Sequence, residues 1–152
     1  MYYVHFTLNL CKPILVQDSL IEANGAWGHA PRRSKLIPIV GFPSFVPGWN
    51  LTAIKMNFMV LRSSESFGYI ENCEASSPFE IYKLLEDIFH MHVSDYDIYV
   101  SPLGTRPHCL GAALFASNFS SSYLIYDFPV EKKFRSQNVL KANFYNLTKF
   151  IK

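Results

Sequence analysis

In residues 95–118 a strand signal is followed directly by a helix signal, and this order restricts the fold strongly. The apolar run 98–101 stops at Pro102-Leu103-Gly104, which is typical of a tight turn. Thr105-Arg106-Pro107 then favours a helix start, because threonine caps helices and proline suits their first turn. Small apolar residues continue the predicted helix over 107–116. The stretch therefore predicts a strand, a turn and a helix in succession.

The same alternation extends over most of the chain. Predicted strands cover residues 36–40, 67–72, 98–101 and 123–128, and predicted helices cover 47–61, 78–90 and 107–116. Strands that alternate with helices favour a parallel sheet joined by right-handed crossovers. Several strand cores are apolar throughout, as a sheet covered on both faces requires. The sequence therefore predicts an α/β fold, a Rossmann-like, mostly parallel sheet with flanking helices in two or three layers.

Three segments carry weaker patterns. Residues 47–61 place apolar side chains at alternate positions and also at helical spacing, and their length and start signals favour a helix over a strand. Residues 14–23 fit a short helix and a strand equally well. Residues 137–151 have a rough helical pattern, which predicts a C-terminal helix.

The opening residues 2–10, YYVHFTLNL, alternate between apolar and polar side chains. A period of two with one polar face predicts a strand at or near the edge of the sheet. The direction of this strand is open, and an antiparallel arrangement is the alternative to a parallel one. His5 lies on the polar face, where a solvated or hydrogen-bonded histidine is expected rather than a ligand.

Residues 77–90 carry the clearest local signal in the chain. Ser77 is a predicted helix cap, Pro78 is the predicted first helical residue, and Glu80 completes a capping box. Apolar residues then recur every three or four positions. This spacing predicts an amphipathic helix over residues 78–90.

Composition limits the function classes. A chain of 152 residues, 49% hydrophobic and 17% charged, predicts one globular domain over residues 1–152, either alone or as a fragment or subunit of a larger protein. A net charge of +2 is too small to indicate nucleic-acid binding. The sequence contains no apolar stretch long enough to cross a membrane and no recognisable signal peptide, so the cytoplasm is the expected location.

Cysteine and glycine spacing excludes several kinds of site. Cys11, Cys73 and Cys109 have neither metal-ligand nor redox spacing, so the sequence predicts no metal site and no disulfide framework. Gly104 and Gly111 do not form a dinucleotide fingerprint, and the sequence contains no lysine-bearing phosphate loop. The sequence therefore indicates no particular cofactor.

The best candidate for a ligand site is the set of loops after the predicted strands. In an open parallel sheet, ligands bind beyond the carboxyl ends of the strands. Four predicted loops meet there, namely residues 41–44, 71–77, 101–108 and 127–129. Arg106 offers donors suited to phosphate or carboxylate beside the free amides of a helix start. We predict an anion site there, with ligand-binding residues Ser44, Asn72, Ser101, Gly104, Thr105 and Arg106.

Titratable side chains near these loops are candidate acid–base groups. His108 follows the helix start and titrates near neutral pH, so it is a candidate catalytic residue. Glu71 and Asp127 are the other two catalytic candidates. The alternative is ordinary turn chemistry, in which Arg106 pairs with one of the nearby aspartates, Asp95, Asp97 or Asp127.

No nucleophile of the chain lies in a recognised catalytic motif. Cys73 follows a predicted strand and lies beside Glu71 and Glu74. Repulsion between these carboxylates and a thiolate predicts a raised pKa for Cys73, which argues against a reactive thiol.

Two function classes remain. In the first, the chain is an α/β module that binds an anionic small molecule at residues 101–108, and the lack of a catalytic motif leaves enzymatic activity open. In the second, it is a non-catalytic interaction subunit or the C-terminal fragment of a larger assembly. An aromatic content of 16% favours burial against another chain, either in a homo-oligomer or against a larger partner protein.

Overall fold

The computed structural model describes the backbone of residues 2–7 and the full residues 35–125 and 142–150. The described residues form helices and short parallel strand pairs, so the predicted α/β class is confirmed. The strands in these ranges do not close into a barrel. The predicted element 14–23 lies outside the described residues.

The strands of the described ranges form two ladders, and every pair in them is parallel. β1 (Tyr2–Thr7), β4 (Ile98–Leu103) and β5 (Ser122–Leu124) lie in the order β1-β4-β5. β2 (Ile39–Gly41) pairs with β3 (Glu71–Cys73) in the second ladder. Because β1 runs parallel to β4, the antiparallel alternative for the opening strand is wrong.

The strand predicted at residues 67–72 is largely replaced by a 3-10 helix, η1 (Ser66–Tyr69). The ring of Phe67 packs against Phe58 of the preceding helix, with ring centroids 5.4 Å apart. This stretch is therefore packed against a helix and is not part of the sheet. β3 begins only at Glu71, whose N–H donates to the Pro38 carbonyl oxygen at 2.9 Å. The predicted strand is therefore placed too early in the chain.

Residues 47–61 are mostly helical, which rules out the strand alternative, but the prediction of one continuous helix is wrong. α2 (Trp49–Met56) and α3 (Phe58–Ser63) are separated by Asn57. The side-chain Nδ2 of Asn57 donates to the Ala53 carbonyl oxygen at 2.8 Å, and the backbone N–H donates to the same oxygen at 3.2 Å. The Asn57 N–H thus completes the last helical bond of α2, and its side chain adds a second donor to the same carbonyl oxygen where the helix ends.

α4 (Pro78–His92) begins where the sequence predicts. The Ser77 hydroxyl accepts from the Glu80 N–H at 3.2 Å, and Pro78 is the first helical residue. The other half of the predicted capping box is replaced, because the Glu80 carboxylate accepts from the Glu74 N–H at 3.1 Å. The cap therefore ties the start of α4 to the residue after β3.

α5 (Arg106–Asn118) crosses α4 at a glycine. A Cβ added to Gly111 would overlap the Pro78 carbonyl oxygen and the Ile81 Cγ2 atom of α4. Gly111 and Ala112 are both buried, in agreement with the small-residue face expected from the sequence. The missing side chain of Gly111 therefore lets α5 approach α4 closely.

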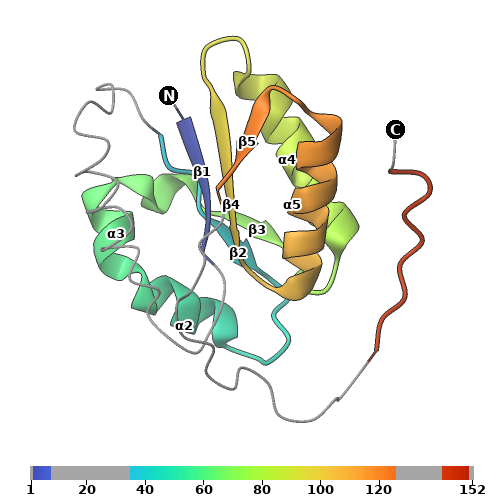
Figure 1. Cartoon of the computed structure of the whole chain (residues 1–152). Coiled ribbons are helices and arrows are strands. Elements are labelled where there is room, and N and C mark those ends of the chain that lie inside the picture. Colours follow the sequence, from blue (N-terminus) through green and yellow to red (C-terminus); the bar gives the residue numbers. More distant parts are fainter. Residues whose placement is uncertain (1, 8–34, 126–141, 151–152) are drawn as a thin grey trace, which may run out of the picture.

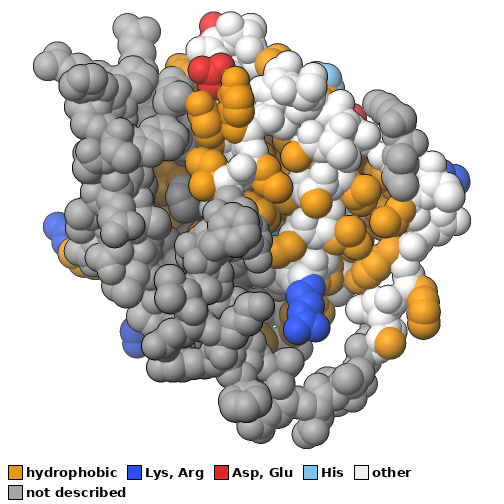
Figure 2. Space-filling model, viewed as in Figure 1, with side chains coloured by type: hydrophobic (Ala, Val, Ile, Leu, Met, Phe, Trp, Pro, Cys, Tyr) orange, Lys and Arg blue, Asp and Glu red, His pale blue; other side chains and the backbone are white. Residues whose placement is uncertain are grey.

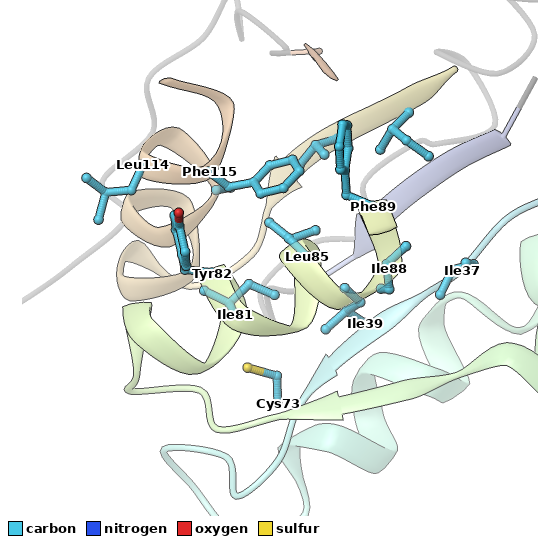
Figure 3. Packing of buried hydrophobic residues seen from close by; sticks show 13 residues of the cluster. Ile37, Ile39, Cys73, Ile81, Tyr82, Leu85, Ile88, Phe89, Leu114 and Phe115 are labelled. Carbon is cyan, nitrogen blue, oxygen red and sulfur yellow. The ribbon is translucent and has the colours of Figure 1, made fainter. Parts of the chain in front are cut away.

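A hydrophobic core lies between the strands and the pair α4 and α5 (Figure 3). Fully buried side chains at its centre include Ile39, Ile81, Leu85, Ile98, Val100 and Phe115. Val40, the next residue along β2, packs instead with Ala53 and Ile54 of α2. Because neighbouring strand residues point to opposite faces, helices cover both faces of β2, and Figure 1 shows α2 and α3 on one side with α4 and α5 on the other.

β5 is shorter and more exposed than the buried strand predicted at residues 123–128. Tyr123 and Leu124 are both exposed, and the ring of Tyr123 stacks on Tyr99 of β4 with centroids 4.8 Å apart. Residues 126–128 lie outside the described ranges. Figure 2 shows hydrophobic side chains gathered over β5 and α5 on the face in view. β5 is therefore an apolar edge of its ladder.

Residues 142–150 contain no helix, so the described part of the helix predicted at 137–151 is wrong. The Oδ1 atom of Asn146 accepts from the Thr148 N–H at 3.1 Å and from its hydroxyl at 2.7 Å. Such a local side-chain turn competes with helical bonding. The segment, drawn in red in Figure 1, runs alongside the starting end of α4.

Candidate functional site

The carboxyl ends of β2, β3 and β4 are joined by hydrogen bonds between the loops that follow them. The Phe42 N–H donates to the Cys73 carbonyl oxygen at 2.7 Å, and the Ala75 N–H donates to the Pro43 carbonyl oxygen at 3.1 Å. The Thr105 hydroxyl then donates to the Ala75 carbonyl oxygen at 2.7 Å. Three of the four predicted loops therefore meet, and the fourth, 127–129, lies outside the described residues.

Thr105 holds two elements together with a single hydroxyl group. Its Oγ1 atom accepts from the His108 N–H at 3.3 Å, which caps α5, while its proton is donated to Ala75. The residue is 5% exposed. Because the single proton of the hydroxyl is donated to Ala75, Thr105 acts here as a support for the loop rather than as an exposed donor.

His108 lies beneath the loops and is 1% exposed. Its Nε2 atom lies 2.8 Å from the Glu74 carbonyl oxygen. A carbonyl oxygen can only accept, so Nε2 carries the proton and the neutral ring leaves Nδ1 as an acceptor. Nδ1 has no partner within the described part of the chain.

Burial lowers the pKa of His108 from its usual value, and this effect outweighs the opposing influence of the Glu74 carbonyl bond and the Glu80 carboxylate. Desolvation penalises the charged form of a histidine and favours the neutral ring. The neutral ring of His108 therefore links the loop after β3 to the first turn of α5.

The fold is expected to lose stability as the pH falls below about 7, partly through His108. Its folded pKa lies below the unfolded pKa of about 6.5, so the unfolded state binds more protons in this range. The stability that the neutral His108 contributes is fully present above its unfolded pKa, and it is lost as the pH falls through its folded pKa. In His108→Gln, which keeps an N–H donor, the free energy of unfolding measured in urea should depend less on pH.

His90→Gln is the matched control, because His90 is exposed and lies on α4 away from these loops. The free energy of unfolding should depend less on pH in His108→Gln than in this variant. An unchanged pH dependence in His108→Gln would contradict a buried, neutral His108.

Arg106 is the first residue of α5, and its side chain is exposed. Within the described residues it forms no ion pair, so Asp95 and Asp97 are not its partners, while Asp127 lies outside those ranges. Few amides remain open beside it, because Pro107 has no N–H and the His108 N–H is bonded to Thr105. The guanidinium is therefore the principal donor at this helix start.

No protein-family model matches this chain, and no curated protein matches it. The assignment of a function therefore rests on the geometry of the molecule. Within the described ranges, no group of three or more histidine, cysteine, aspartate or glutamate side chains could hold a metal ion. The helices of the same ranges include none that is long and apolar enough to span a bilayer.

The remaining predicted ligand residues occupy three different places. Ser44 is half-buried, and its hydroxyl donates to the Val46 carbonyl oxygen at 2.7 Å. Ser101 is 6% exposed within β4, and Gly104 is half-buried in the turn after it. Ser101 and Gly104 lie on the route from β4 to α5, whereas Ser44 lies in the loop after β2, and among the predicted ligand residues only Arg106 places a charged group in solvent.

Glu71 and Asn72 belong to β3 and not to the loop after it, so the predicted loop 71–77 begins too early. Both side chains are exposed. They pair with Ile39 and Val40 of β2 through the backbone. Their place on the strand separates them from the hydrogen-bonded loop ends, and the predicted catalytic role of Glu71 stays a prediction.

Cys73 is the last residue of β3 and is buried. Burial raises the pKa of its thiol to about 12, and the carboxylates of Glu80 and Glu74 add to this shift. The direction of the predicted rise is confirmed, but its main cause is desolvation, and the contributing carboxylates are Glu80 and Glu74 rather than Glu71 and Glu74. Cys73 is therefore not a reactive thiol.

Sequence reasoning did not find the role of residues 74–76. The Glu74 carbonyl oxygen contacts His108, and the Glu74 carboxylate accepts a hydrogen bond from the Ser76 hydroxyl. The Ser76 carbonyl oxygen accepts from the Tyr145 hydroxyl at 2.9 Å. These partners are far apart in the chain, and local sequence patterns do not predict contacts between such distant residues.

Proposed function

We propose that this chain is an α/β module that binds an anionic small molecule, bearing a phosphate or a carboxylate, in front of α5 at residues 104–106. The observation that carries the proposal is the exposed guanidinium of Arg106 at a point where three strand-end loops are hydrogen-bonded together. A guanidinium fork suits both kinds of anion.

The proposal includes one continuous, Rossmann-like sheet in the order β3-β2-β1-β4-β5. Its support is that β1 contacts β2, which places the two parallel ladders next to each other. The chain goes from β2 to β3 through α2 and α3, and from β3 to β4 and β5 through α4 and α5. In this sheet β1 would be central, and not at the edge as its sequence pattern predicts.

The order of the strands reverses between β1 and β4 in such a sheet. Open α/β sheets bind ligands outside the carboxyl ends of their strands at this kind of reversal. Thr7 and Leu103 are paired at the carboxyl ends of β1 and β4, and Arg106 follows Leu103 closely. The proposed anion therefore lies where the topology alone would place a ligand.

Arg106 is the main determinant of affinity in this proposal. The hydroxyl of Thr105 and the amide of His108 are used inside the protein, which leaves the guanidinium as the charged donor. His108 is buried and bonded to Glu74, so its position favours a supporting role for the loop. We therefore propose binding and assign no catalytic step.

Anion binding is expected to raise the melting temperature of the protein. A ligand at 100 times its Kd stabilises a fold by about 2.7 kcal/mol. Thermal melts with inorganic phosphate, nucleotides, sugar phosphates and dicarboxylates test this directly. Arg106→Ala should abolish the shift produced by any active anion.

Arg62→Ala is the matched control, since Arg62 is exposed on α3 and lies on the other side of the strands (Figure 1). It removes the same charge and should keep the full shift. A shift that survives in Arg106→Ala, or that disappears equally in both variants, would contradict a site at residues 104–106.

An interaction surface is the second candidate function, and a concentration of exposed hydrophobic side chains favours it. Single exposed apolar residues are normal, but contiguous ones mark interaction sites. Nine large hydrophobic side chains between residues 42 and 69 are exposed, and they are close together in the sequence: Phe42, Phe45, Val46, Leu51, Met56, Phe58, Met59, Phe67 and Tyr69. No thermal shift with any anion, together with a dimer or larger species in solution, would favour this function over the first.

A further inference from the structure

Residues 142–150, here called the aromatic segment, bind to a surface formed by α4, α5 and the loop before α4. This surface, here called the segment-binding surface, consists of Ser76, Phe79, Tyr82 and Asn118. The aromatic segment forms no helix and joins no strand ladder, so side chains and single backbone groups hold it in place.

Aromatic stacking supplies the apolar part of this contact. The Phe150 ring stacks on Phe79 with centroids 4.6 Å apart, and it meets Tyr82 edge-on at 5.1 Å. The Tyr145 ring meets Phe79 edge-on at 5.9 Å. Leu147 and Phe150 are both packed against the main core. Such ring pairs add about 0.5–1.5 kcal/mol each beyond the area they bury.

Hydrogen bonds fix the position of the segment at Tyr145 and at its last described residue, Phe150. The Asn118 Nδ2 donates to the Phe150 carbonyl oxygen at 2.6 Å and to the Tyr82 hydroxyl at 3.0 Å. The Tyr145 hydroxyl donates to the Ser76 carbonyl oxygen at 2.9 Å. Because the Asn118 amide binds a backbone carbonyl oxygen, this bond fixes where the backbone of the segment lies and does not depend on the side chain at that position.

The segment uses a few inward side chains and leaves the rest in solvent. Tyr145, Leu147 and Phe150 are partly buried, whereas Phe144 is 97% exposed and Lys149 is exposed. The hydrogen bonds between segment residues are local, such as the one from the Phe150 N–H to the Leu147 carbonyl oxygen. The segment is therefore held by a few anchoring side chains, without a helix or a strand of its own.

We propose that the segment-binding surface also accepts the aromatic segment of a second copy of this chain, so that two copies exchange segments. Residues 126–141 separate Ile125 from the segment and have a contour length of about 50 Å. A domain of this length has a radius of gyration of about 15 Å, so the chain is long enough to reach a neighbour. The contacts described above need no change when the segment comes from another copy.

The tethered segment competes with the second copy. Covalent connection within one chain gives an effective concentration in the millimolar range, so the chain's own segment occupies the surface at micromolar protein concentrations. Exchange becomes measurable when the internal contact is broken in each of two variants in complementary ways. The wild-type protein is then a monomer when dilute, and exchange is revealed by mixing.

A complementation experiment with the full chain tests the proposal. The surface variant is Phe79→Ala with Asn118→Ala, which keeps the aromatic segment; the segment variant is Tyr145→Ala with Phe150→Ala, which keeps the surface. Each variant alone should sediment as a monomer. An equimolar mixture should form a heterodimer of twice the mass, and a chain carrying all four substitutions should form none with either variant.

A synthetic peptide of residues 142–152 provides a second measurement on the full-length segment variant. Saturable binding is expected, and adding Asn118→Ala should weaken it about tenfold through loss of the bond to the carbonyl oxygen of Phe150. The peptide measurement does not use the surface variant and adds only Asn118→Ala to the segment variant. It therefore still tests the proposal if the surface variant does not fold. Monomers alone in every mixture up to about 1 mM, or peptide binding that Asn118→Ala leaves unchanged, would overturn the proposal.

Discussion

Gly111→Ala is expected to destabilise the folded state by about 3 kcal/mol, the upper end of the usual cost of overpacking. The added Cβ would overlap the Pro78 carbonyl oxygen and the Ile81 Cγ2 atom, and a backbone atom cannot turn aside as a flexible side chain can. Helix propensity alone would favour alanine over glycine by about 1 kcal/mol, so the packing effect opposes the local preference. The free energy of unfolding in urea measures the outcome.

Gly68→Ala is the matched control for this change. No atom lies within 4 Å of a Cβ built on Gly68, and its φ is not in the left-handed region. That substitution should leave stability unchanged or raise it slightly, since alanine restricts the unfolded chain more than glycine. Equal stability of Gly111→Ala and Gly68→Ala would mean that α4 and α5 do not cross as closely as described.

Local signals predicted α4 and α5 well because their information is contained in neighbouring residues. Ser77 and Thr105 each cap the helix that follows, and proline is the first or second helical residue in both cases. These interactions span three residues and do not depend on the rest of the fold. The sequence therefore located both helix starts to within one residue.

The meeting of the strand-end loops could also be predicted, because it follows from topology rather than from individual contacts. Parallel strands that alternate with helices bring their carboxyl ends to one edge. The bonds that join the loops could not be predicted: Thr105 finds Ala75 across 30 residues, and His108 finds Glu74 across 34. No periodicity in the sequence encodes these partners.

The errors in secondary structure arise where a side chain or a tertiary contact overrides a periodic pattern. The helical run is interrupted at Asn57, whose side chain donates to the Ala53 carbonyl oxygen. In residues 142–150 the apolar side chains follow a helical rhythm in the sequence, but Phe150 and Tyr145 instead pack against Phe79 of α4. Burial of these rings on a preformed surface stabilises the segment more than helix formation would, because an isolated helix of that length is only marginally stable.

The candidate site and the segment-binding surface share one loop, residues 74–77. Thr105 and His108 hold this loop from the side of α5, and the Tyr145 hydroxyl holds it through the Ser76 carbonyl oxygen. The position of Arg106 therefore depends on the same backbone that anchors the aromatic segment.

Phe115→Ala is expected to cost about 3–5 kcal/mol of stability and to lower the melting temperature by about 10 °C. Its ring is 0% exposed and stacks on Phe119 with centroids 4.7 Å apart, and it meets the ring of Phe89 edge-on at 5.9 Å. Removing it leaves a cavity between α4, α5 and the strands (Figure 3). Phe144→Ala makes the same chemical change at a side chain that is 97% exposed, and it should alter stability by less than about 0.5 kcal/mol. Similar losses for both variants in urea unfolding would show that Phe115 does not lie at the centre of the core.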